Sequence, residues 1–174
     1  RRVLIAELLQ GALVEDLVIT GCVDEFHLVD VSTPSSPTQL AIVPVAASSV
    51  AAKPDQWVGE YVAMTGIVEA SVGKMAFTVD QDKTKAAPEV LVLAGRMSDP
   101  VTPNTYVTVI GLLMKYDPAD VAAKSKVHAQ DLGADAAKYK GKPVVLATSI
   151  VNDKMLDLAR FADGSRRILN VSEV

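Results

Sequence analysis

Three apolar, strand-like stretches of the 174-residue chain each carry a glycine near the middle. The glycines are Gly21 in "LVITGCVDE", Gly66 in "VAMTGIVEA" and Gly111 in "VTVIGLLMK", and successive glycines lie 45 residues apart. A glycine inside a strand weakens it, unless the strand bends sharply or another backbone passes close by, as at the corners of a small barrel. The pattern therefore predicts a barrel of strongly bent strands, in which valine at Gly66 or Gly111 destabilises the fold.

The same spacing is compatible with an internal repeat. The pattern T-G-x-V occurs at 20–23 and at 65–68, and each copy is followed by a phenylalanine-containing strand that ends in aspartate, at 26–30 and 76–80. Barrel corners explain the three glycines more simply than a triplication does. The two copies that resemble each other most, at 20–30 and 65–80, favour a duplicated unit.

Alternating, β-branched stretches bounded by turn residues predict a mainly β fold. The predicted strands are 17–24, 26–31, 39–46, 60–71, 74–80, 89–95, 105–115, 143–151 and 166–171. Prolines in the intervening segments mark loops, because proline cannot donate to a central ladder. Helices are predicted at 3–10, 117–132 and 154–161, and a linker or short helix at 47–56.

Residues 57–151 resemble an OB-fold, the small five-stranded barrel, and more narrowly the small OB domains of bacterial envelope proteins and lipoproteins. The resemblance rests on "WVGEYVAMTGIVEASVGKMAFTVDQD", "EVLVLAG", "NTYVTVIGLLMKYD" and "KGKPVVLA". In these stretches a long strand with a central glycine precedes a strand of the form A-F-T-V-D. The long predicted helix follows the fourth strand of this set, whereas the resemblance implies a helix between the third and fourth.

The chain is expected to have three parts: a partial OB-like β unit at 1–50, an OB-like barrel at 51–151, and a C-terminal extension at 152–174 that packs on the barrels. The first part is two strands short of a barrel. It must therefore take strand pairing from the barrel, from the C-terminal segment or from another chain. An apolar fraction of 49% favours a subunit of an assembly. We expect a homo-oligomer or filament formed through strands 17–46.

The charge of the chain is uneven. Residues 1–82 carry 4 Lys or Arg against 11 Asp or Glu, while residues 83–174 carry 13 against 10, for a net charge of −4. Such a balance gives no general attraction to nucleic acid. The nearest basic patch is a weak candidate for ligand or phosphate contacts, because acidic residues interrupt it and mixed charge is usual for a solvated surface. Its members are Lys124, Lys126, Lys138, Lys140 and Lys142.

Nucleic-acid-binding OB-folds stack bases on aromatic side chains of their second and third strands. In this chain those strands carry one aromatic residue, Phe77, which alternates with Met75 and Val79. That alternation indicates a buried face, so Phe77 is expected in the core. We therefore do not expect nucleic acid as a partner.

No metal, cofactor or disulfide is predicted. Cys22 is the single cysteine, and with His27 it supplies at most two ligands, whereas a structural zinc site needs four. We expect Cys22 to be buried and inert, and His27 to point outward. The stretch "DQDKTK" begins like a calcium loop, but Lys85 and Leu91 stand where that loop requires glycine and glutamate.

No arrangement of nucleophile and base stands out either, since His128 lies in a predicted helix without a visible serine or cysteine partner. We therefore predict that the protein is not an enzyme. The favoured function is a self-associating structural or interaction module of the cell envelope or exterior; the alternative is an oligonucleotide- or oligosaccharide-binding OB-fold. No apolar run reaches the roughly 18 residues of a membrane span. The chain starts at Arg1, so we expect it to begin inside a longer precursor.

Overall fold

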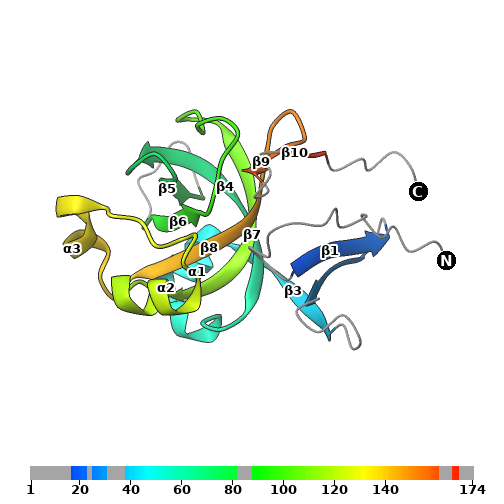
Figure 1. Ribbon diagram of the computed structural model, residues 1–174, viewed down its shortest axis with the longest axis horizontal. Helices are drawn as coiled ribbons and strands as arrows, with labels where there is room; N and C mark the ends of the chain where they lie inside the picture. Colours follow the sequence, from blue (N-terminus) through cyan, green and yellow to red (C-terminus); the bar gives the residue numbers. More distant parts are fainter. Residues whose placement is uncertain (1–16, 23–24, 31–37, 82–87, 161–165, 169–174) are drawn as a thin grey trace.

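The computed structural model describes residues 17–22, 25–30, 38–81, 88–160 and 166–168, with side-chain environments for 41–81 and 88–159. The fold is mainly β, with extra strands around a barrel and a few short helices, which confirms the predicted fold class (Figure 1). The strands are β1 (Leu17–Cys22), β2 (Glu25–Asp30), β3 (Thr38–Ala46), β4 (Tyr61–Ser71), β5 (Ala76–Asp80), β6 (Val90–Ala94), β7 (Tyr106–Lys115), β8 (Pro143–Asn152), β9 (Leu156–Arg160) and β10 (Arg166–Ile168). The helical elements are α1 (Ala47–Ala52), η1 (Pro54–Gln56), α2 (Pro118–Lys124), η2 (Gly133–Asp135) and α3 (Ala136–Tyr139).

Five strands close into a barrel in the order β4, β5, β6, β8, β7 and back to β4. Four of the five neighbouring pairs are antiparallel, and β6 and β8 run parallel. Parallel neighbours cannot be joined by a tight turn, so the chain crosses from β6 through β7 and a long connection before it returns as β8. This closed barrel is compatible with the OB-like fold predicted for residues 57–151.

At Gly66 and Gly111 the backbone of another barrel strand passes close by. A Cβ atom on Gly111 would lie 2.8 Å from the Cα atom of Ala147 and closer still to the preceding carbonyl oxygen, while one on Gly66 would lie 2.6 Å from the carbonyl oxygen of Asp80. The pairing of β7 with β8 also shifts register between Ile110 and Gly111. Such a bulge bends a strand, as a small barrel requires.

Apolar side chains fill the inside of the barrel. Phe77 is 1% exposed and packs in this core with Met64, which confirms the prediction that Phe77 is a core residue. Ala47 and Val50 are fully buried in the same core. The helix α1, which spans the predicted boundary between residues 50 and 51, therefore packs with the barrel.

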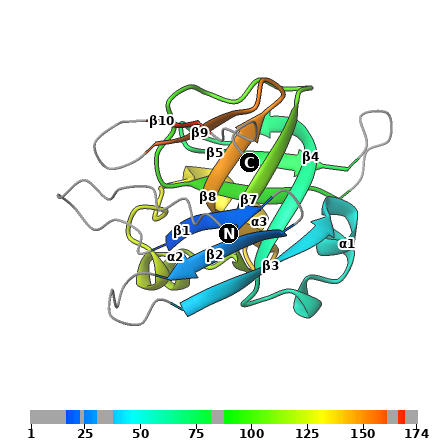
Figure 2. The same cartoon turned by 90° about the vertical axis from the view of Figure 1, so that its right-hand side faces the viewer.

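β1, β2 and β3 form an antiparallel meander that stands to one side of the barrel (Figures 1 and 2). β3 continues from the meander to pair in parallel with β4, from Ile42 opposite Tyr61 to Ala46 opposite Thr65. Of the three sources of strand pairing considered for this part of the chain, the barrel is the one observed. Gly21 lies opposite Phe26 in a hairpin without a bulge.

The helix predicted at 154–161 is wrong, because this segment forms the hairpin strand β9 on β8. The Asn152 side-chain oxygen accepts hydrogen bonds from the N–H groups of Lys154 and Leu156, both at 3.0 Å. Met155 adopts a φ of 59°, a left-handed conformation that completes a tight turn. The alternation of Leu156 and Leu158 then has the period of a strand.

Asp157 is fully buried and links β9 to β8 through hydrogen bonds. Its carboxylate accepts hydrogen bonds from the Ser149 hydroxyl at 2.7 Å and from the N–H groups of Ile150 and Ala159 at 2.9 Å each. Three donors offset the cost of burying the charge. The C-terminal hairpin is therefore held by a specific polar contact as well as by its strand pairing.

The helix predicted at 117–132 is correct in its start and too long at its end. Asp117 caps α2 by accepting a hydrogen bond from the N–H of Ala119 at 2.9 Å, and Pro118 occupies the first turn. The helix stops at Lys124, since Ser125 turns to an extended conformation while its N–H still bonds to the Val121 carbonyl. The helix predicted at 3–10 lies outside the described residues.

Candidate functional site

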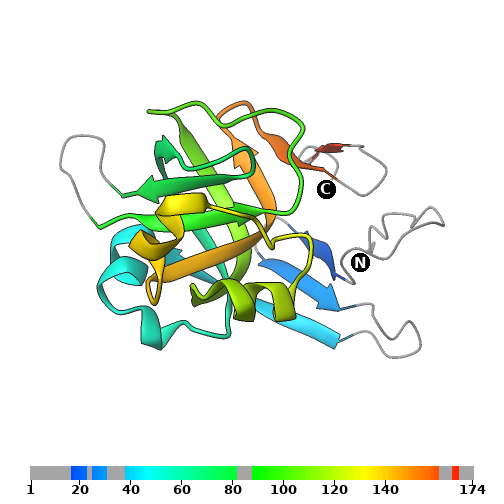
Figure 3. The same ribbon diagram turned by 60° about the vertical axis from the view of Figure 1, so that its left-hand side comes forward.

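The connection between β7 and β8 (residues 116–142) carries all five candidate lysines and lies over the outside of the barrel (Figure 3). Its apolar side chains form a second hydrophobic cluster with the outer faces of the strands. The connection contributes Tyr116, Val121, Leu132 and Tyr139, and the strands contribute Ala76, Leu91, Leu93, Leu112, Val144 and Leu146. Every residue of β5 and of β6 is consequently buried. The two strands that would form the ligand face of an OB-fold are covered on both sides.

Side chains of this connection also bind the barrel through backbone carbonyl groups. Gln130 donates from Nε2 to the carbonyl oxygens of Met75 at 3.0 Å and Ala94 at 2.8 Å. His128, which is 1% exposed, lies with Nε2 3.0 Å from the carbonyl oxygen of Ala147. These contacts join the connection to the strands beneath it at three points.

The hydrogen bonds of His128 define its tautomer. A carbonyl oxygen only accepts, so Nε2 carries the proton, and Nδ1 then accepts from the Ser125 hydroxyl at 2.7 Å. Burial lowers the pKa of His128, opposed in part by the bond to Ala147. The expectation that His128 has no serine partner is therefore wrong, because the chain turns just after α2 and brings Ser125 back to the ring. The S-x-x-H spacing at the helix end was the available signal.

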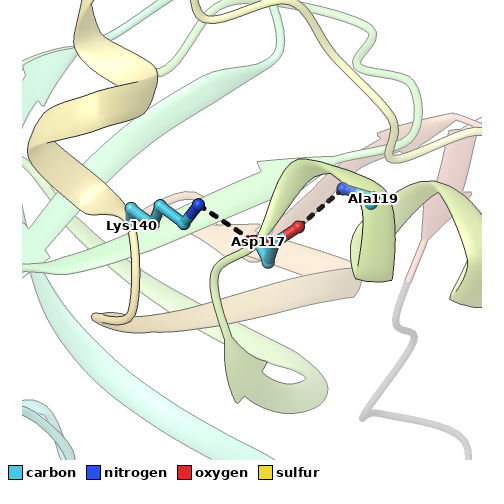
Figure 4. A network of polar contacts seen from close by, with 3 residues as sticks. All are labelled: Asp117, Ala119 and Lys140. Atoms are coloured by element: carbon cyan, nitrogen blue, oxygen red, sulfur yellow. Dashed lines mark hydrogen bonds and ion pairs between the residues drawn. The ribbon is translucent and has the colours of Figure 1, made fainter.

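The five candidate lysines are all exposed and fall into two groups. Lys140 lies 3.6 Å from the Asp117 carboxylate at the start of α2 (Figure 4). Lys138 and Lys142 place their ammonium groups 5.1 and 5.9 Å from the centre of the Tyr139 ring. These three lysines form the first group. Lys124 and Lys126 form the second group, at the C-terminal end of α2.

The seven residues of α2 span about 10 Å at 1.5 Å per residue. The two groups of lysines therefore start from opposite ends of α2, and Asp117 offsets the charge of Lys140. Contact of these lysines with a phosphate or another ligand stays a prediction.

Two cavities open on the surface of the described part of the chain. The first has a volume of about 310 Å³ and lies between the β7–β8 connection and β6, lined by Leu93, Tyr116, Val121, Gln130 and Leu132 among others. Burial, followed by the charges of Asp117 and Asp131, raises the pKa of Tyr116 in this cavity. The second, of about 360 Å³, lies between the β6–β7 loop and the β8–β9 hairpin and includes Asp99, Thr102 and Lys154 in its lining.

Cys22 and His27, the two residues that the sequence analysis weighed as metal ligands, lie on the paired strands β1 and β2. Cys22 lies opposite Glu25, and His27 opposite Thr20, so the strand register sets Cys22 and His27 two positions apart. The side chains of these residues lie outside the described environments, as does most of the calcium-like loop at 80–85. Within the described residues, no three His, Cys, Asp or Glu side chains come together in a way that could hold a metal ion.

Among the helices of the described segments, none is long and apolar enough to cross a membrane. The chain matches no model of a known protein family, and no curated protein matches it.

Proposed function

We propose that this protein is a non-catalytic structural or interaction module that associates with itself through the β1–β3 meander. The observation that carries the proposal is the exposure of β3. Ile42, Val43 and Val45 are only half-buried, although all three are apolar and two of them are consecutive. Consecutive strand residues point to opposite faces, so apolar surface remains accessible on both faces of β3.

The rest of the described surface supports a contact role better than binding of an oligomeric ligand to the barrel. Both faces of the β5–β6 ladder are occupied, by the barrel core on one side and by the β7–β8 connection on the other. An oligonucleotide or oligosaccharide would have to displace side chains such as Val121, Leu132 and Tyr139 to reach these strands. The candidate lysines also lie apart at the two ends of α2.

The cell envelope or exterior is the proposed location. The support for it is the resemblance of residues 57–151 to the small OB domains of bacterial envelope proteins and lipoproteins. The location is tested by fractionating cells of the source organism and probing each fraction with an antibody against the whole chain. Recovery in the cytoplasmic fraction alone would exclude it.

Self-association is tested by measuring the mass of the whole chain by light scattering over a wide concentration range. The proposal expects a mass above that of one chain. The alternative is tested in parallel by the fluorescence anisotropy of a labelled single-stranded DNA at low and high salt, because binding to phosphates weakens steeply with salt. A monomer at all concentrations, together with salt-dependent DNA binding, would replace the proposed function with the alternative.

A further inference from the structure

The outer edge of β1 is open among the strands that the structure describes. The strand order begins at β1, which pairs with β2 over all six of its residues, from Leu17 opposite Asp30 to Cys22 opposite Glu25. A strand directs its N–H and C=O groups alternately to its two sides, so about half of those of β1 point away from β2. These groups form a template for a further strand.

β1 also lacks the features that keep strand edges apart. Its sequence, "LVITGC", contains no charged residue and no proline, and its register with β2 has no bulge. The other end of the strand order is different: β10 has only three residues, two of them Arg166 and Arg167, and its register with β9 is irregular. Short, charged and irregular strands resist pairing with another edge. The described sheet therefore has one open end and one protected end.

We propose that two copies of this chain pair through their β1 strands, antiparallel about a twofold axis, to form the continuous sheet β3-β2-β1-β1-β2-β3. An identical copy fits this edge because, in the antiparallel register with complete overlap, every residue of β1 faces an uncharged residue of the other β1. Since the order of the described strands has one open end in each chain, the pairing closes at two copies and does not propagate into a filament. This inference rests on the proposed self-association and specifies its surface and its stoichiometry.

The register with complete overlap places Leu17 opposite Cys22 of the second copy, and Ile19 opposite Thr20. Residues directly opposite in an antiparallel pair have Cα atoms roughly 4.5 or 5.5 Å apart, within the range that a disulfide spans. Within one chain, Leu17 and Cys22 lie at the two ends of β1, about 17 Å apart at roughly 3.4 Å per residue. A disulfide between these two positions can therefore form between copies and not within one.

The first experiment introduces Leu17→Cys in the whole chain, with the native Cys22 retained, followed by mild oxidation. We expect a covalent dimer on a non-reducing gel that a reductant returns to the single chain. The controls are the unmodified chain, which has Cys22 alone, and the double variant Leu17→Cys/Cys22→Ser, and neither should cross-link efficiently. No dimer in the first variant, or equal amounts in all three, would overturn the proposed pairing.

The second experiment measures the mass by light scattering. The unmodified chain should have twice the mass of one chain and no larger species. Ile19→Lys/Thr20→Lys, which sets like charges opposite each other across the axis, should shift it to a monomer. The matched control, Ala122→Lys/Ala123→Lys, adds the same charge at exposed positions of α2 and should remain a dimer. Circular dichroism tests whether each variant is folded. If Ile19→Lys/Thr20→Lys is unfolded, the cross-linking experiment decides whether the β1 strands pair.

The outcomes separate this inference from the proposed function. A monomeric unmodified chain overturns both. An oligomer that neither cross-links through Leu17→Cys nor responds to lysines in β1 leaves self-association standing and overturns the pairing of β1 strands.

Discussion

Replacing Gly111 by alanine tests the close approach of β7 and β8 with the smallest possible side chain. The added methyl group would lie 2.8 Å from the Cα atom of Ala147 and closer still to the carbonyl oxygen of Leu146. Both neighbours are backbone atoms of a central barrel strand, so no side chain can rotate away to make room. The barrel must either widen at this corner or lose hydrogen bonds at the bulge next to Gly111.

The expected cost follows from two opposing contributions. Forcing extra atoms into a packed interior costs about 1–3 kcal/mol. Alanine also restricts the unfolded chain more than glycine does, which raises the free energy of unfolding by about 0.4–1 kcal/mol. We expect a net loss of roughly 1 kcal/mol in the free energy of unfolding, which lowers the Tm of a chain of this size by about 2–4 °C.

Two further glycines make the experiment a graded series. Gly66→Ala meets a carbonyl oxygen at 2.6 Å and should also destabilise, whereas Gly73→Ala meets its nearest atom, the Ala76 Cβ, at 3.9 Å and should be neutral or slightly stabilising. The free energy of unfolding is measured by urea denaturation, and the Tm by circular dichroism. If Gly111→Ala and Gly66→Ala both match Gly73→Ala, the close approach of the strands is not what requires glycine at these positions.

Two other predictions concern buried polar groups. Asp157→Ala leaves two buried donors and one partly buried donor without a partner, and should lower the free energy of unfolding by about 3 kcal/mol or more. Asp157→Asn keeps an acceptor for the two N–H groups and should lose about 1 kcal/mol, so equal losses in urea denaturation would contradict the role given to the carboxylate. Because burial lowers the pKa of His128 in the folded state, the unfolded chain binds more protons below its ordinary pKa of about 6.5. The stability that neutral His128 contributes is therefore complete above this pH, and is lost as the pH falls from it through the lower pKa of the folded state. His128→Gln should flatten the decline in stability between about pH 7 and 5, and an unchanged pH profile would show that His128 does not cause it.

Local patterns were sufficient to predict most of the strands. β-Branched residues in alternation at 61–71 and 106–115, bounded by turn residues, have few good conformations other than an extended one, so the elements follow from the residues themselves. The same holds for the start of α2, where Asp117 and Pro118 are adjacent in sequence to the groups they serve. The β8–β9 hairpin shows the limit of such patterns. Its short segment was assigned to a helix, because the contacts of Asp157 with Ser149 and Ile150 lie on the neighbouring strand.

Which strands become neighbours was decided by the tertiary structure alone. The pairing of β6 with β8 joins segments some fifty residues apart in the chain, beginning with Leu91 opposite Val144. The spacing of apolar residues in β6 does not identify β8 as its partner. The parallel pairing of β3 with β4 and the packing of Tyr139 over the barrel also join segments that are not adjacent in sequence. The sequence by itself determined that these segments are strands, since the backbone conformation of a residue depends largely on its own side chain and its immediate neighbours. It did not determine that the β5–β6 face is covered, or that the β1 edge is open among the described strands, because these properties depend on how distant segments meet in space.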